Sequence, residues 1–504
     1  MRTPQDHIFQ LIHAMTPAEK RFFRVHFASD KAVLSDIFDL INGQKAYDEN
    51  EIKAALGSKT ARQYKVLKIQ LSELLMKSLV TEHFKESALS KIRLGLEEVD
   101  ILLSKQLMDH AAQQLGKVRK LCEKYQEFTY LIEVAYKEIY IFYHRLEQVV
   151  SGTADFLRTI RQSVEHMQMH LGYMEMVTRI QDIARSRPSS YTREDVEYAL
   201  SLQQTLDKVD LATLPVRTRL TYFSIYIFIH SILGDLEAQL KYRKQAIILF
   251  RKNPEFQENM GLLYLSALRN YANYCFEKAY YEEVENVISE TLDLVERQPA
   301  LQIHFNHFLY LRLKMILYTS QYKNLPPDFK KTILRHLRKY NQEEDRIAGL
   351  IYLNLVVFNI AIEKYSRAQL YIMRARDVGE NLELHFRQGL VALQMILDII
   401  TGDLDKVAAL LKLQLKEEHS AGYRIFLDLI AEIVTARSPL SAVCLVYSQK
   451  MKAAPKDAFL YVCDSLYITT WLEAVSAGVP FTELLPKVSP KKMPNPLDKE
   501  VGYI

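Results

Sequence analysis

Side chains that could do chemistry are few and scattered in this sequence. His304 and His307 are three residues apart, and His166 and His170 are four apart among several methionines. At these spacings each pair lies on one face of a helix, which is how many metal sites begin, and methionine suits a soft metal. Carboxylates are remote from His304 and His307, and methionine at helical spacing is more typical of a core or an adaptable contact. We therefore predict that neither pair binds a metal.

Established catalytic and phosphate-binding motifs are absent from the sequence. It contains no GxxxxGK[ST] loop, GxGxxG fingerprint, HExxH, GxSxG or EF-hand loop. The four cysteines are isolated from one another and form no CxxC pair, which indicates buried, inert thiols in a reducing compartment; they are Cys122, Cys275, Cys444 and Cys463. We expect a protein that is not an enzyme, with no catalytic residue, cofactor or metal.

Composition narrows the class of protein. The chain has 504 residues, 49% of them apolar and 25% charged, with a formal net charge of +4. Glycine and proline number 15 each, about half of average usage, so long helices are expected and collagen-like or disordered classes are excluded. The near-balance of charge does not indicate a polyanion partner. The sequence shows neither a secretory signal nor an apolar run of about 20 residues, which favours a cytoplasmic protein without a membrane partner.

Helical hairpins recur along most of the chain. From about residue 90, apolar residues recur at i, i+3, i+4 and i+7, the period of an amphipathic helix, and strand-like alternation is hard to find. Tight turns separate pairs of such helices near residues 234, 279, 320, 363 and 402, at intervals of 45, 41, 43 and 39 residues. A fixed-period array of helix pairs is typical of a solenoid.

These units resemble the tetratricopeptide repeat. In the unit around residues 268–295, Tyr271 and Ala272 match the family's large–small pair, Ala279 stands at the turn glycine, and Tyr281 at the aromatic position. The interval exceeds the family's usual repeat of about 34 residues. The resemblance covers roughly residues 90–435, and the whole chain is similar to long bacterial members of that class, a similarity that implies no activity. It implies an all-α, right-handed solenoid of helical hairpins preceded by a small N-terminal helical domain.

The resemblance also implies a concave face that binds a protein or peptide. Arginine, lysine and asparagine there would hold carboxylates or backbone groups, and aromatic rings would give apolar contact. The expected groove residues are Phe228, Arg269, Asn273, Phe276, Tyr310 and Lys314.

The first 85 residues form a separate unit with two interpretations. Thr16 is expected to cap a helix that begins with Pro17, with Glu19 completing a capping box. Further on, Asp48 is expected to cap a short helix that ends at Leu56, and a long helix follows the turn at residues 57–58, the outline of a helix-turn-helix. A DNA reader would use side chains on this second helix; the candidates are Arg62, Tyr64, Lys65 and Lys68.

The other interpretation makes the same helix structural. Residues 1–85 carry 13 Lys/Arg and 10 Asp/Glu, a net charge of only +3. The basic side chains then form a solvated face opposite a buried face; the expected buried residues are Val66, Leu67, Leu71, Leu74 and Leu75. On this view the unit caps the repeat array or docks a partner.

Five segments are expected along the chain. They are a helical domain at 1–85, long degenerate hairpins at 86–215, tetratricopeptide-like repeats at 216–440, capping helices at 441–478, and an extended tail at 479–504 that holds five prolines between 480 and 496. The function we expect is a non-enzymatic scaffold that binds a protein or peptide in its groove. The alternative is a DNA-binding transcriptional regulator whose repeats act as a sensor.

Overall fold

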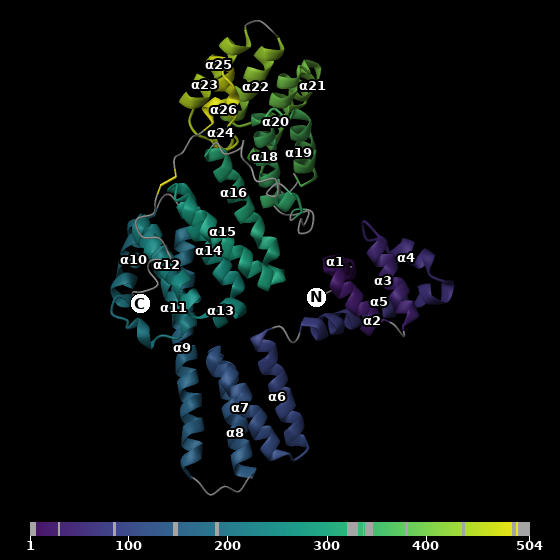
Figure 1. The fold of residues 1–504 in the computed structure, drawn as a ribbon, viewed down its shortest axis with the longest axis vertical. Helices are drawn as coiled ribbons and strands as arrows, with labels where there is room; N and C mark the ends of the chain where they lie inside the picture. Colours follow the sequence, from purple (N-terminus) through teal and green to yellow (C-terminus); the bar gives the residue numbers. More distant parts are fainter. Residues whose placement is uncertain are drawn as a thin grey trace. The chain divides into compact units, whose positions relative to one another are not determined.

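The computed structural model describes most of the chain. The described residues are 7–28, 31–83, 87–144, 150–186, 191–319, 331–335, 337, 346–378, 382–435, 439–485 and 490–491. They are almost entirely helical and include no strand (Figure 1). The expected all-α class is confirmed.

Two compact units divide the chain. The first contains residues 1–176 and 210–219, and the second contains residues 177–209 and 220–504. The boundary falls within the segment expected at 86–215, because the long helix α9 (Val150–Ser186) enters both units. Contacts made in space, which the sequence pattern does not report, therefore set the division.

Two of the N-terminal helices of the first unit, those capped by Thr16 and Asp48, begin where the sequence predicts. Its first five helices are α1 (His7–Ala14), α2 (Pro17–His26), α3 (Ala32–Gly43), α4 (Glu49–Ala55) and α5 (Ser58–His83). Thr16 and Glu19 form the complete capping box of α2, and the Asp48 carboxylate accepts from two backbone N–H groups of α4. Apolar side chains of all five helices share one core, which includes Phe23, Ile37 and Leu71.

A second core lies in the helices that follow. They are α6 (Ala88–Ser104), α7 (Met108–Lys124) and α8 (Phe128–His144), with α9 beyond them. Ile92, Val99, Leu115 and Val134 are fully buried among these helices. This core is distinct from the one formed by α1–α5.

The second unit continues as a series of helices. In chain order they are α10 (Arg193–Leu206), α11 (Val216–Ile232, entered from the first unit), α12 (Leu236–Lys252), α13 (Pro254–Asn259), α14 (Gly261–Glu277), α15 (Tyr281–Arg297), α16 (Asn306–Tyr318), α18 (Arg346–Ala361), α19 (Tyr365–Asp377), α20 (Leu384–Thr401), α21 (Leu404–Gln414), α22 (Ala421–Val434), α23 (Leu440–Ala453), α24 (Ala458–Ser465), α25 (Ile468–Ala477) and α26 (Phe481–Leu484). One 3-10 segment, Pro299–Phe305, lies between α15 and α16, and another, Leu211–Thr213, belongs to the part of the first unit that precedes α11.

One turn geometry joins seven pairs of successive helices within the described residues. A residue with positive φ sits in each turn, at Gln106, Gln126, Gly234, Ala279, Glu363, Gly402 and Gly478. The next residue donates its N–H to the carbonyl five positions earlier, as in Tyr280 to Cys275 at 2.8 Å and Asp403 to Asp398 at 2.8 Å. This is the hydrogen bond of the Schellman motif. Four of the five expected turn positions are therefore confirmed, and residue 320 lies outside the described residues.

The unit that best matches the tetratricopeptide pattern uses the matching residues as core. Tyr271 and Ala272 are fully buried, and Tyr281 is almost so. Ala279 adopts a φ of 61°, the left-handed region that glycine prefers. Helices α14 and α15 and the turn at Ala279 therefore occur where the sequence predicts them.

All four cysteines are reduced and buried, as predicted.

The segment expected to be extended from residue 479 instead contains α26, which begins after Pro480. Proline fixes φ at a value that helices share, so it can precede a helical turn. Farther along, the Lys491 N–H donates to the Ala279 carbonyl at 2.8 Å. Of the helices in the described part of the chain, none combines the length and apolar character needed to cross a membrane.

Candidate functional site

Five of the six expected groove residues lie on α14 and α16 of the second unit. Arg269 is exposed on α14, and the other four are half-buried; these are Asn273 and Phe276 on α14 and Tyr310 and Lys314 on α16. Phe228 is half-buried on α11. The interactions described below involve the five residues on α14 and α16; Arg269 takes part through its charge.

His307 connects the two helices, a role that the sequence did not reveal. Its Nε2 atom lies 2.9 Å from the Asn273 Oδ1 atom, so a neutral imidazole protonated at Nε2 donates to that amide. Burial, and then the positive charge of Arg269, lower the pKa of His307 to about 4. A charged imidazole is costly here because it would lose solvent and lie near a guanidinium. His307 is therefore neutral at pH 7 and ties α16 to α14.

Lys314 lies among aromatic rings. Its Nζ atom is 5.5 Å from the centroid of Tyr310 and 5.9 Å from that of Tyr318, within the range of a cation–π contact. It also donates to the Ser465 Oγ atom at 3.3 Å. Burial lowers the pKa of Lys314, although the nearby Tyr318 opposes this change. Phe276 packs against one of these rings, with its ring centroid 5.3 Å from that of Tyr318.

Arg269 and Lys314 have no carboxylate partner among the described residues. Ion pairs within 4.0 Å occur elsewhere on the same helices, such as Arg312 with Glu285 at 3.0 Å. Neither Arg269 nor Lys314 makes such a pair with another described residue. We define the α14–α16 surface as the residues Arg269, Asn273, Phe276, His307, Tyr310, Lys314 and Tyr318. It combines positive charge with aromatic area.

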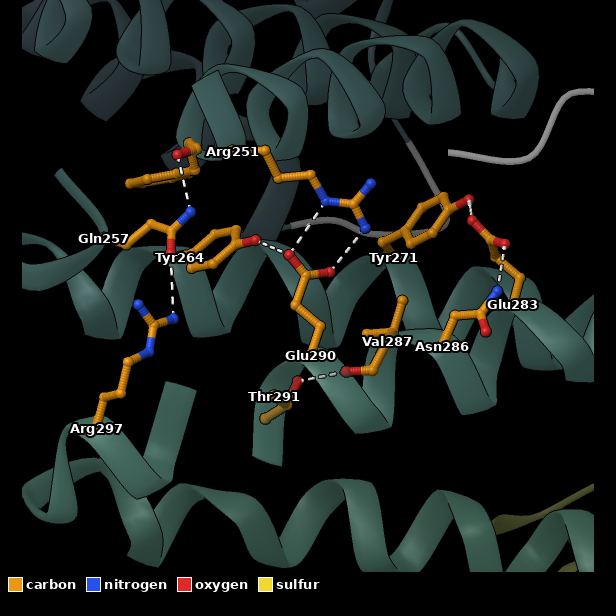
Figure 2. A network of polar contacts seen from close by, with 11 residues as sticks. Arg251, Gln257, Tyr264, Tyr271, Glu283, Asn286, Val287, Glu290, Thr291 and Arg297 are labelled. Atoms are coloured by element: carbon orange, nitrogen blue, oxygen red, sulfur yellow. Dashed lines mark hydrogen bonds and ion pairs between the residues drawn. The ribbon is translucent and has the colours of Figure 1, made fainter. Parts of the chain in front are cut away.

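A polar network holds α14 against its neighbours and so fixes the backbone that carries this surface (Figure 2). The Arg251 guanidinium of α12 donates to both carboxylate oxygens of Glu290 on α15, at 3.1 and 2.8 Å, and Tyr264 of α14 donates to the same carboxylate. Tyr271 donates to Glu283 at 2.7 Å, and both side chains are buried. Burial raises the pKa of Tyr271, which keeps its hydroxyl protonated as a donor.

Helix α5 exposes fewer of the candidate nucleic-acid contacts than the sequence predicts. Tyr64 is fully buried, and its hydroxyl lies 3.3 Å from that of Tyr47, so it is not available as a contact. Lys68 is directed inward, where it donates to the Tyr47 hydroxyl at 2.7 Å and lies 3.8 Å from Glu49. Arg62 and Lys65 remain exposed. Tyr64 is thus corrected from a candidate contact to a core residue that fixes α4 against α5.

The structure also corrects part of the expected buried face of α5. Leu71 and Leu75 are fully buried and Leu67 and Leu74 are partly so, but Val66 is 58% exposed. Tyr64, two residues earlier, takes the core position instead. The buried face is therefore rotated relative to the expected one.

The two histidine pairs do not come together as metal sites. His304 is exposed in the 3-10 segment before α16, while His307 is engaged with Asn273. His166 stacks on Phe128 with ring centroids 4.7 Å apart, and His170 lies 3.4 Å from the Thr218 hydroxyl. The described residues contain no group of three or more His, Cys, Asp or Glu side chains placed to bind a metal ion.

The sequence indicates Arg269 and Lys314 as candidate residues, but it does not predict the contacts of His307 and Ser465 that connect the helices around them. His307 lies three residues before Tyr310 on the same helix face, and this spacing was the available signal. Ser465 is 151 residues from Lys314, too far for any local pattern to connect them.

Comparison of the chain with protein-family models, curated proteins and solved structures finds no match.

Proposed function

We propose that the chain is a non-enzymatic interaction scaffold whose α14–α16 surface binds an acidic segment of a partner protein. The observation that carries the proposal is that Arg269 and Lys314 have no carboxylate partner among the described residues. Cations beside apolar rings bind a ligand that supplies both a carboxylate and an apolar side chain.

The chemistry of the surface specifies the ligand further. Arg269 is exposed and can hold a carboxylate with two parallel hydrogen bonds. Lys314 is partly desolvated, so a carboxylate that reaches it is attracted more strongly than one at a fully hydrated lysine. The aromatic rings of Phe276 and Tyr310 lie near these cations and offer contact area. The ligand we expect is an acidic peptide with an aromatic or aliphatic residue.

Repeated Schellman turns support the larger architecture of this proposal. Helix pairs closed by the same turn can stack into a tetratricopeptide-like solenoid, and such arrays present extended surfaces for binding. In that arrangement the α14–α16 surface would belong to the concave face. The scaffold would act by holding its partner rather than by changing it chemically.

The test selects ligands and then compares variants. A displayed library of random 12-residue peptides is selected on the full chain, and the enriched peptides are expected to be acidic. Their affinity, measured by calorimetry, is expected to fall about 10-fold or more in Arg269→Glu, a loss of about 1.4 kcal/mol. Arg62→Glu with Lys65→Glu, which reverses two exposed cations of the first unit, is the matched control and should leave affinity unchanged. Equal binding by Arg269→Glu would exclude this surface.

A second readout is independent of mutation. A carboxylate bound beside Arg269 offsets the positive charge that contributes to the low pKa of His307. Binding of a selected peptide is therefore expected to raise the pKa of His307, measured by NMR titration of its imidazole. An unchanged His307 titration in the saturated complex would place the ligand elsewhere.

A further inference from the structure

An exposed apolar stripe runs along α9 in the first unit. Val164, Met167, Leu171 and Met174 are 37%, 40%, 60% and 42% exposed, respectively. Their spacing of three, four and three residues is the a and d pattern of a seven-residue repeat. Monomeric proteins rarely leave such a contiguous row in water. The period indicates that the row fits another helix.

The stripe forms part of the wall of a cavity between α8 and α9, which Arg217 and Thr218 at the start of α11 also line. The cavity has a volume of about 510 Å³, and its lining includes Phe128, Thr129 and Ile132 of α8 as well as all four stripe residues. The two helices lie side by side and antiparallel, because Phe128 contacts His166 at one end and Phe142 contacts Phe156 at the other (Figure 1). The trough that they form is mainly apolar and open to solvent.

Charged residues border the stripe in a self-complementary order. Arg161 and Glu175 are exposed, and each follows a d position of the repeat by one residue, with Gln168 midway between them. In an antiparallel helix pair these positions face their counterparts on the partner helix. Arg161 of one copy then lies opposite Glu175 of the partner subunit, and the pair occurs twice.

We propose that α9 binds α9 of a second copy of this chain in antiparallel orientation. In this register Val164 lies against the partner's Met174, and Met167 lies against the partner's Leu171, so that four apolar layers form. Together with α8 of each copy, the interface is an antiparallel bundle of four helices. A parallel pairing would instead place Arg161 beside the partner's Phe156 and away from the partner's Glu175.

The first experiment measures self-association of the full chain by sedimentation velocity over a range of concentrations. The wild type is expected to dimerise, and Leu171→Glu is expected to weaken the dimer about 10-fold or more because it places a carboxylate in an apolar layer. Leu370→Glu is the matched control, since Leu370 is 49% exposed on α19. The proposal is overturned by a wild type that stays monomeric at about 100 µM. A dimer that survives Leu171→Glu overturns it as well.

The second experiment tests the antiparallel register by exchanging charges. Arg161→Glu alone and Glu175→Arg alone each place like charges opposite one another twice, so each homodimer is expected to weaken about 10-fold at low salt. The double variant restores both pairs and should dimerise like the wild type. An equimolar mixture of the two single variants should form heterodimers in preference to either homodimer. A mixture that shows no such preference would overturn the antiparallel register.

Discussion

His307 makes the second unit sensitive to pH. Its pKa is about 4 in the folded chain, against about 6.5 for an unperturbed histidine. Because the unfolded chain binds the proton first, the stability that neutral His307 contributes is fully present above pH 6.5 and is lost as pH falls toward 4. We expect the wild type to lose on the order of 2 kcal/mol more than His307→Gln over this window. Chemical denaturation of both proteins at pH 7 and pH 4.5 measures this difference in the free energy of unfolding. Equal losses in the two proteins would contradict the burial of His307.

The buried pair of Tyr271 and Glu283 is expected to contribute to the stability of α14 and α15. Tyr271→Phe removes a donor at 2.7 Å from a buried carboxylate and leaves that oxygen without it. The expected cost is about 1–3 kcal/mol in the free energy of unfolding. Tyr461→Phe is the control, because Tyr461 is 64% exposed. Urea denaturation of both variants makes the comparison, and equal stabilities would show that the hydrogen bond contributes nothing.

Turns can be tested at the scale of the helix pair. Gly402 has a φ of 81°, and no atom lies within 4 Å of a Cβ built there, so Gly402→Ala adds backbone strain without a clash. We expect a loss of about 1 kcal/mol. Gly172 lies inside α9 with equally open space and no positive φ, so Gly172→Ala should gain about 0.5–1 kcal/mol. Thermal denaturation compares them, and the same sign for both would contradict the turn geometry.

Local signals predicted the elements well, and distant contacts explain what they missed. The caps at Thr16 and Asp48 and the turns at Ala279 and Gly402 depend on residues close in sequence, so their chemistry could be recognised there. The inward position of Tyr64 depends on Tyr47, which lies 17 residues earlier in the loop between α3 and α4. The same holds for the α14–α16 surface, where residues 34 positions apart are joined by one hydrogen bond.

At the scale of the whole molecule, separate cores imply separate unfolding. Ile37 and Val99 are both fully buried, the first in the core of α1–α5 and the second in the core of α6–α8. Ile37→Ala is expected to cost about 2–5 kcal/mol and to lower amide protection in residues 7–83 while residues 88–141 keep theirs. Hydrogen exchange measures both regions at once. A uniform loss of protection would mean that the two cores unfold together.

The buried thiols make this chain convenient for site-specific labelling. Burial raises the pKa of Cys122 and Cys275 to about 12 and that of Cys444 to about 11, and it raises the pKa of Cys463 as well. Because the thiolate is the species that reacts with maleimides, all four native cysteines should react slowly. A single cysteine introduced at exposed Glu282 on α15 would then carry a fluorophore or spin label without removing any native residue from the core.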